Sequence, residues 1–207
     1  MKKLLITLVT VFTMISLGHA QQQIGIKGAF HLSNMAVDKD QILESNNKGG
    51  FSIGLINRTE KGFMLIQTEL LWSRKGAKYD LADVTNTSVN ANLDYIEIPV
   101  SFGIKVFESP LSIYGGVYGA YLINAKYEYK DSAENTTATY DQKDRFNKLD
   151  FGAQLGFQIK IDNLLLDARY QRGLRNVEND DVTINNTLYL ANDTKNFNFQ
   201  VSAGFLF

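Results

Sequence analysis

The stretch FNFQVSAGFLF, residues 197–207, decides the fold class of this chain. Side chains alternate between the two faces of a β-strand. One face of this segment therefore carries four phenylalanines with a valine and an alanine, and the other carries asparagine, glutamine, serine, glycine and leucine. Its length suits a tilted strand that crosses a bilayer. Taken alone, the segment fits a strand of a soluble β-sandwich equally well.

The amino terminus predicts export from the cytoplasm. Two lysines precede an apolar stretch, residues 4–17, and a small residue follows at Ala20. This layout is that of a cleavable secretory signal peptide. We therefore expect two parts, a signal peptide over residues 1–20 and a single domain over residues 21–207. The apolar stretch is shorter than the roughly 18 residues of a membrane-spanning helix.

Composition excludes several classes of protein. The chain has no cysteine, so it has no disulfides, no thiolate metal site and no lipoprotein attachment. Its formal net charge of −1 argues against nucleic acid as a partner. Beyond residue 20 no long apolar run occurs, although hydrophobic residues make up 44% of the chain. A helical membrane protein is therefore excluded.

Apolar residues instead recur at every second position, which is the pattern of a transmembrane β-barrel. Eight segments show this alternation, and the fourth shows it most sharply. They are residues 24–33, 50–58, 63–75, 93–106, 111–123, 149–161, 164–173 and 197–207.

The connections between these segments alternate in length. Three are short, at residues 59–62, 107–110 and 162–163. Four are long and polar, at residues 34–48, 77–92, 124–148 and 174–196. Outer-membrane barrels have short periplasmic turns and longer extracellular loops, and a sheet in lipid must close on itself. The sequence therefore predicts an all-β, eight-stranded antiparallel up-and-down transmembrane β-barrel in the bacterial outer membrane, closed by pairing of the last segment with the first.

Four motifs resemble the PorT-like outer-membrane β-barrel proteins of Bacteroidetes, in the order in which that family has them. They are IGIKG at 24–28, ELLWSRKG at 69–76, YIEIPV at 95–100 and DARYQRGL at 167–174. His31 and Trp72 depart from the family's usual Asn and Tyr. The resemblance implies the barrel fold and an outer-membrane location. One family member is tied to a protein-secretion system, and that role does not carry over on these motifs.

Charged residues on the inward faces predict a polar plug. The interior of an eight-stranded barrel is just wide enough to be filled by side chains, so charges there must be paired and hydrogen-bonded. We expect a lumen charge network that closes the pore, and the alternative is a narrow pore that conducts ions. The expected network residues are Arg58, Glu69, Glu97, Asp150, Asp167 and Arg169.

His31 is the only histidine beyond residue 20. Some outer-membrane barrels are lipid-A hydrolases that use a histidine, a serine and an acid, and Ser33 lies two residues away. The sequence places no acid beside them, so we favour a structural or loop-contacting His31 over a lipid-A-modifying enzyme. A single histidine without cysteine also argues against a transition-metal site. We therefore assign no catalytic, cofactor-binding or metal-binding residue.

Aromatic residues near the ends of outward faces predict contacts with the membrane interfaces. We expect Trp72, Tyr121 and Tyr170 at the outer interface and Phe157 at the inner one. The aromatic carboxy terminus, Phe205 and Phe207, predicts the signal that barrel-assembly machinery reads.

These features together predict a non-enzymatic protein with a structural, surface-interaction or envelope-assembly role. The expected partners are outer-membrane lipid and lipopolysaccharide, the barrel-assembly machinery during insertion, and an envelope protein bound through the long extracellular loops. Loops displayed on a rigid scaffold are where recognition is usually found.

Overall fold

The computed structural model describes residues 21–36, 45–80, 87–107, 109–131, 136–141, 147–176, 182–184, 187–189 and 195–207. The predicted signal peptide, residues 1–20, lies outside these ranges. All regular secondary structure within them is β-strand. The described part of the chain contains no helix long and apolar enough to cross a membrane.

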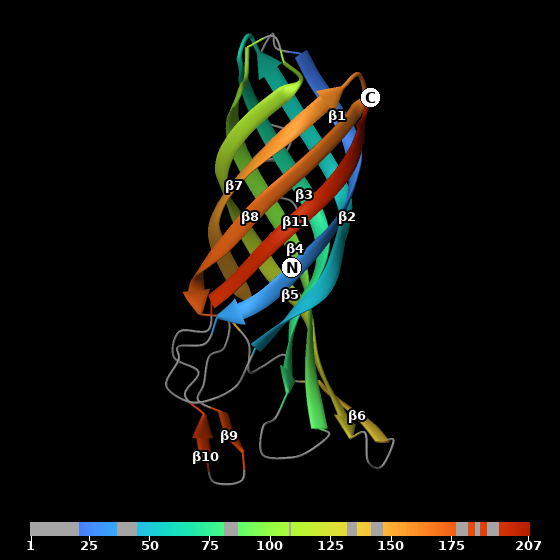
Figure 1. The fold of residues 1–207 in the computed structure, drawn as a ribbon, viewed down its shortest axis with the longest axis vertical. Helices are drawn as coiled ribbons and strands as arrows, with labels where there is room; N and C mark the ends of the chain where they lie inside the picture. The colour runs from blue at the N-terminus through green and yellow to red at the C-terminus, as the bar shows by residue number, and fades with distance from the viewer. Residues whose placement is uncertain are drawn as a thin grey trace, which may run out of the picture.

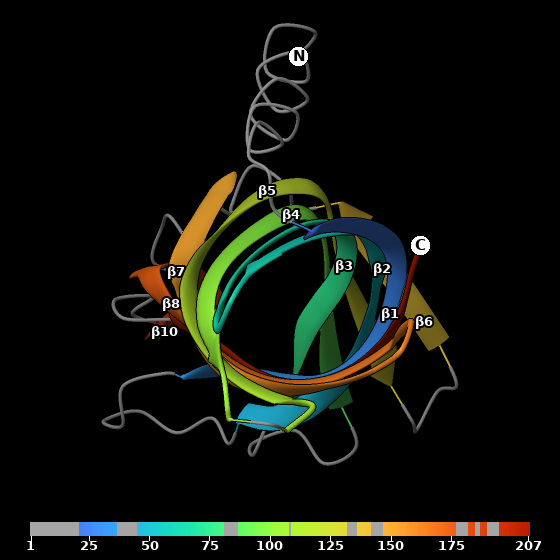
Figure 2. The ribbon, with the colours of Figure 1, turned by 90° about the horizontal axis from the view of Figure 1, so that it is seen from above.

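Eight antiparallel strands form one closed barrel, as the sequence predicted (Figures 1 and 2). Around the barrel the order is β4-β3-β2-β1-β11-β8-β7-β5, and β5 pairs back with β4. The barrel strands are β1 Gln21–Ala36, β2 Ser45–Lys61, β3 Met64–Asp80, β4 Thr87–Lys105, β5 Leu111–Asp131, β7 Leu149–Ile161, β8 Leu164–Asn176 and β11 Lys195–Leu206.

The first and last strands close the barrel. β1 pairs with β11 from Gly25 opposite Leu206 to Ala36 opposite Lys195. The backbone N–H of Phe207 then donates to the carbonyl of Ile24 at 2.7 Å, so the ladder continues to the last residue. The terminal segment is therefore the closing strand, which confirms its predicted pairing.

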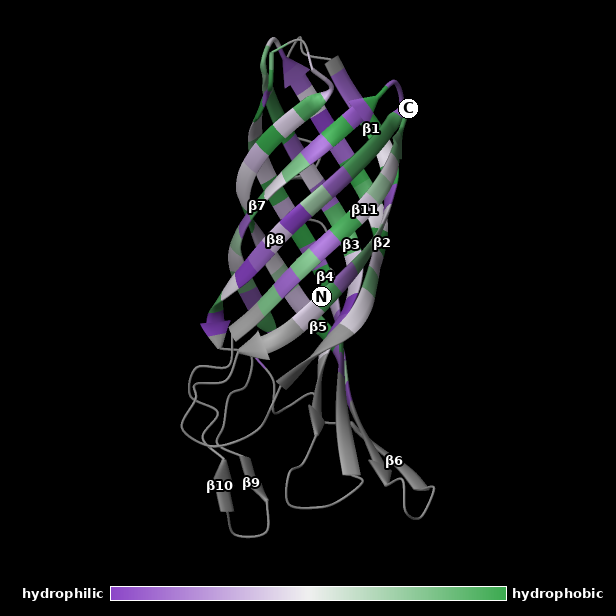
Figure 3. Ribbon diagram, in the orientation of Figure 1, coloured by the Kyte–Doolittle hydropathy of each residue, from purple (hydrophilic) through white to green (hydrophobic). Residues whose placement is uncertain are grey.

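Hydrophobic and hydrophilic residues alternate along the barrel strands (Figure 3). The apolar side chains point outward and the polar ones inward. In β7 exposed and buried residues alternate from Leu149 to Gln158. On the outer surface Phe30 is 75% exposed, Leu155 63% and Phe102 60%. So much exposed apolar surface is a liability in water. In a bilayer the same surface contacts lipid, which is the arrangement of a transmembrane barrel.

Tight turns connect the strands at one end of the barrel, here called the short-turn end. The turns after β2 and β7 have two residues each, and their first residues, Gly62 and Asp162, have φ of 60° and 49°. Asn163 also donates its side-chain amide to the carbonyl of Leu206 at 2.6 Å. The carboxy terminus lies at this same end (Figure 1).

At the opposite end, here called the loop end, the strands run further than predicted. β3 reaches Asp80, and β4 and β5 remain paired as far as Thr87 and Asp131. Three further strands, β6 Thr136–Asp141, β9 Val182–Ile184 and β10 Thr187–Tyr189, lie in segments predicted as loops. Threonine, tyrosine and valine favour strands. These segments lack a continuous apolar face, so hydrophobic alternation does not reveal them.

Removal of Phe207 should lower the amount of folded protein in the outer membrane. Its ring packs edge-on against Phe205, with centroids 5.6 Å apart, and its backbone N–H supplies the last hydrogen bond between β1 and β11. The measurement is the heat-modifiable fraction on gels of isolated outer membranes, with Phe207→Tyr as the control that keeps an aromatic terminus. Wild-type amounts of the truncated protein would show that Phe207 has no role in assembly.

Candidate functional site: the polar interior of the barrel

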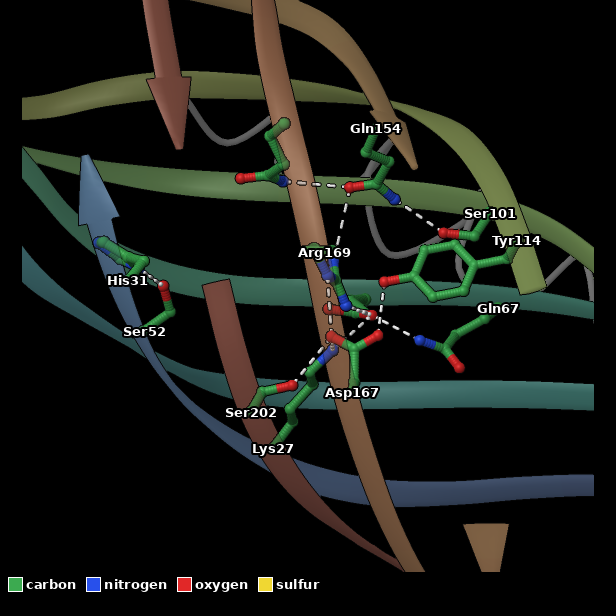
Figure 4. A network of polar contacts seen from close by, with 12 residues as sticks. Lys27, His31, Ser52, Gln67, Ser101, Tyr114, Gln154, Asp167, Arg169 and Ser202 are labelled. Carbon is green, nitrogen blue, oxygen red and sulfur yellow. Dashed lines mark hydrogen bonds and ion pairs between the residues drawn. The ribbon is translucent and has the colours of Figure 1, made fainter. Parts of the chain in front are cut away.

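Five buried side chains form a central network across the lumen (Figure 4). Arg169 on β8 donates to Asp167 at 3.0 Å through Nε and to Glu69 on β3 at 2.6 Å through Nη2. Lys27 on β1 lies 3.0 Å from Glu69 and 3.1 Å from Asp167. The hydroxyl of Tyr114 on β5 donates to the second oxygen of Asp167 at 2.5 Å. The central network therefore joins four strands and sets two cations against two carboxylates.

Gly156 makes the space that this arrangement needs. On β7 it lies opposite Tyr114 of β5 on one side and Arg169 of β8 on the other. A Cβ atom at this position would lie 2.6 Å from the Tyr114 hydroxyl oxygen. Because glycine has no side chain, the Tyr114 ring can lie over the strand, with the guanidinium carbon of Arg169 5.7 Å from its centroid.

A second polar group surrounds Glu97 on the loop-end side. Lys75 forms an ion pair of 2.6 Å with one carboxylate oxygen of Glu97, and Gln171 donates to the other at 2.7 Å. Gln171 also donates to Gln154 at 3.1 Å, and Gln154 accepts from Arg169 of the central network at 3.5 Å. The two groups are therefore connected through side-chain amides.

A third group, here called the mouth cluster, lies at the short-turn end and consists of Arg58, Glu60, Lys105 and Lys160. The carboxylate of Glu60 accepts from Arg58 at 2.6 Å and from Lys105 at 2.9 Å. The ammonium of Lys160 lies 3.5 Å from the oxygen that Arg58 contacts. Arg58 also donates to Gln67 at 3.3 Å.

The six residues predicted for the lumen network all point inward and are at most 5% exposed. The structure brings Glu69, Asp167 and Arg169 into direct contact. It places Arg58 in the mouth cluster and Glu97 in the group with Lys75. Asp150 accepts from the Tyr118 hydroxyl at 3.4 Å. The predicted set is thus distributed over several groups.

The sequence pattern places Lys27, Lys105 and Lys160 on inward faces as well, but it does not place Glu60 and Lys75 there. Glu60 was assigned to the turn after the second segment, but β2 continues to Lys61 and turns Glu60 inward. The predicted inner face of the third segment ends at Ser73 and omits Lys75, although Lys75 lies in step with Glu69 along β3 and is buried. Extending the two-residue period by one step from Arg58 would have found Glu60.

His31 faces the lumen and is 3% exposed. Its Nε2 lies 2.8 Å from the carbonyl oxygen of Arg74, and its Nδ1 lies 3.3 Å from the Ser52 hydroxyl (Figure 4). Ser33, the serine predicted near His31, instead donates to the carbonyl of Gly76 at 2.9 Å. With Nε2 donating to a carbonyl, Nδ1 is the acceptor for Ser52. The imidazole thus bridges two neighbouring strands inside the barrel wall.

On the outer surface, Trp72 packs edge-on against Phe51 with centroids 5.3 Å apart. The Arg74 guanidinium carbon lies 5.4 Å from the Trp72 ring centroid and its Nε donates to Asp94 at 2.7 Å. Tyr170 is 45% exposed and Phe157 54% exposed, whereas Tyr121 is only partly exposed. All four predicted interface aromatics belong to outward faces.

Among the described residues, no three His, Asp or Glu side chains are grouped so that they could hold a metal ion.

A closed barrel of eight antiparallel strands, apolar outside and charged inside, defines an eight-stranded outer-membrane β-barrel. The family model for the outer membrane protein beta-barrel domain matches residues 19–179 of the chain. The chain belongs to this family and is a protein of the bacterial outer membrane.

One solved structure with a TM-score above 0.5 shows the same fold at low sequence identity. The chain is similar to Ail, the attachment invasion locus protein of Yersinia pestis, in a crystal structure of Ail with the heparin analogue sucrose octasulfate. The TM-score is 0.51 and the sequence identity 16%, and the match covers 90% of this chain and 99% of Ail. Neisserial surface protein A has a TM-score of 0.47 and 11% identity, over 89% of this chain and 97% of that one. No curated protein matches the sequence.

Proposed function

We propose that this protein is a non-enzymatic surface-interaction protein that binds an envelope protein partner at its loop end. The observation behind the proposal is a sheet that continues past the barrel. β7 pairs with β5 only from Leu111 to Tyr121, whereas β4 stays paired with β5 as far as Asp131. Strand β6 then pairs with residues 126–131 of β5 (Figure 1).

The outer edge of β6 is where we place the partner. Within the described residues, β6 pairs with β5 alone and is the last strand of its sheet. An edge strand presents unpaired backbone N–H and C=O groups, to which an extended segment of another protein can add. The sequence of β6, TTATYD, contains neither proline nor lysine, the residues that commonly protect such an edge.

The polar interior supports a structural barrel over the two alternatives. The central network residues are at most 5% exposed, which favours a filled lumen over a conducting pore. His31 and Ser52 are both 3% exposed inside the barrel, where a lipid-A substrate in the outer leaflet does not reach them. The lumen charges therefore act in our proposal as a plug that fixes strand register.

Outer-membrane lipid, lipopolysaccharide and the assembly machinery complete the proposed partners. The outward pair of Trp72 and Arg74 offers an aromatic surface and a cation on the outer face of β3, near the middle of the strand. We also propose that the chain belongs to the PorT-like branch of its family. In support, the four motifs that resemble that branch fall on β1, β3, β4 and β8.

Replacing residues 132–146, which include β6, by a short turn should reduce partner capture by about tenfold, the effect of losing roughly 1.4 kcal/mol of backbone hydrogen bonding. The measurement is crosslinking of the intact chain in its native envelope, followed by quantitative mass spectrometry. Replacing residues 182–189, which include β9 and β10, is the matched control and should leave capture unchanged. Equal recovery from both variants, or no specific partner from wild type, would refute the proposal.

A further inference from the structure

Charge in the lumen is balanced at the centre and unbalanced at the periplasmic mouth. The central network pairs two cations with two carboxylates. The mouth cluster instead places three cations around the single carboxylate of Glu60. A cluster with a net excess of one charge, next to a low-dielectric protein wall, attracts ions of the opposite sign. The excess of positive charge at this end is therefore a local attraction for anions.

The two lysines of the mouth cluster retain donors beyond those that Glu60 accepts. An ammonium group has three donors, and the contacts to Glu60 are a single hydrogen bond of 2.9 Å from Lys105 and a longer contact of 3.5 Å from Lys160. The side chains of Lys105 and Lys160 are 40% and 23% exposed, while that of Arg58 is 1% exposed. The lysines are thus the members of the cluster that a periplasmic ligand can reach.

Gln158 supplies an independent observation next to the lysines. It lies two residues before Lys160 on the inward face of β7. Its neighbours on the two adjacent strands are Ser112, which in turn pairs with Lys105, and Asp167, whose carboxylate is held by Lys27 and Arg169 in the central network. Gln158 is 1% exposed, and neither atom of its side-chain amide has a hydrogen-bond partner. A buried amide without partners is costly, so such a group indicates a missing ligand or water.

We propose that the periplasmic mouth binds an oxyanion, a phosphate or carboxylate group, between Lys105, Lys160 and the amide of Gln158. The two ammonium groups supply the charge and the Gln158 amide N–H donates a hydrogen bond. Hydrogen bonds between charged donors and oxyanions are short and strong, which gives the site its selectivity for oxyanions over chloride. The site is separate from β6, because it lies at the opposite end of the barrel (Figure 1).

The test is a titration of the full chain, folded in detergent micelles, followed through the side-chain amide resonance of Gln158 by NMR. Phosphate and acetate are added in separate titrations, each matched in ionic strength to sodium chloride. We expect a saturating shift with phosphate, with acetate or with both, and the more effective anion identifies the ligand chemistry. A linear response, or the same response to chloride, would overturn the proposal.

Two variants assign the response to the lysines. The double variant Lys105→Gln/Lys160→Gln should bind at least about tenfold more weakly, the effect expected for losing hydrogen bonds to a charged group. Lys148→Gln, which changes an exposed lysine at the loop end, should bind like wild type. If the double variant does not fold, Lys105→Gln alone leaves Glu60 with two cations and should still weaken binding. Unchanged affinity in the folded lysine variants would refute the site.

Discussion

Replacing Arg169 by methionine should lower the free energy of unfolding of the barrel by about 3–5 kcal/mol, the cost of breaking a buried ion pair by removing one partner. Arg169 is 1% exposed and contacts both carboxylates of the central network. Without it, Glu69 and Asp167 share the single ammonium of Lys27. One buried negative charge is then uncompensated, and the Tyr114 ring loses the guanidinium beside it.

The measurement is urea unfolding of the protein in lipid vesicles, monitored by heat-modifiable migration. Arg172→Met is the matched control, since Arg172 lies on the same strand but is exposed on the outer face. That change removes the same charge from β8 and should alter stability by no more than about 0.5 kcal/mol. If both variants lose the same stability, the central network contributes nothing beyond the arginine's charge.

A second substitution separates pairing from packing. The double variant Arg169→Met/Glu69→Met removes the carboxylate of Glu69 together with the guanidinium that it contacts. The ion pair between Lys27 and Asp167, 3.1 Å long, remains. Replacing both members of a buried ion pair by apolar residues of similar size is often nearly neutral. The double variant should therefore be more stable than Arg169→Met alone. Additive losses would show that Arg169 and Glu69 do not interact energetically.

Which residues point inward could be predicted from the sequence, because the period of two needs only the local chain. Asp167 and Arg169 are two apart on β8, and parity places both in the lumen. Which residues meet could not be predicted, because that depends on the register between strands. Lys27 contacts Asp167 across 140 positions of the chain. The same limit led us to place Ser33 beside His31, whereas register brings Ser52 there.

Strand ends were the other source of error. Hydrophobic alternation stops where a strand leaves the membrane, so β4 and β5 were predicted to end near the bilayer although their pairing continues to Thr87 and Asp131. Outside the bilayer a strand needs no apolar face, so the hydrophobic pattern can stop while the backbone ladder continues. Glu60 was missed for a related reason, since a charged residue beside a turn is read as part of the turn.

Replacing Val201 by arginine should destabilise the barrel in lipid by about 2–4 kcal/mol, the cost of an arginine on the lipid face near the bilayer midplane. Val201 lies in the middle of β11, points outward and is 49% exposed. Its neighbours on the two adjacent strands, Phe30 and Ala168, belong to the same apolar surface. No carboxylate among these neighbours is available to pair with the new charge.

The loss in free energy of unfolding should depend on how deep in the bilayer the new arginine lies, and not on its charge alone. Phe197→Arg places a guanidinium on the same outward face of β11, but four residues nearer the loop end. The neighbour of Phe197 on β8 is Arg172, so an arginine already lies at this level of the barrel. An arginine near the interface can extend its head group to water, so Phe197→Arg should cost less than Val201→Arg. Unfolding in vesicles measures both, with Val201→Leu as the conservative control. Equal costs at the two positions would mean that the middle of β11 does not lie in the apolar core of the bilayer.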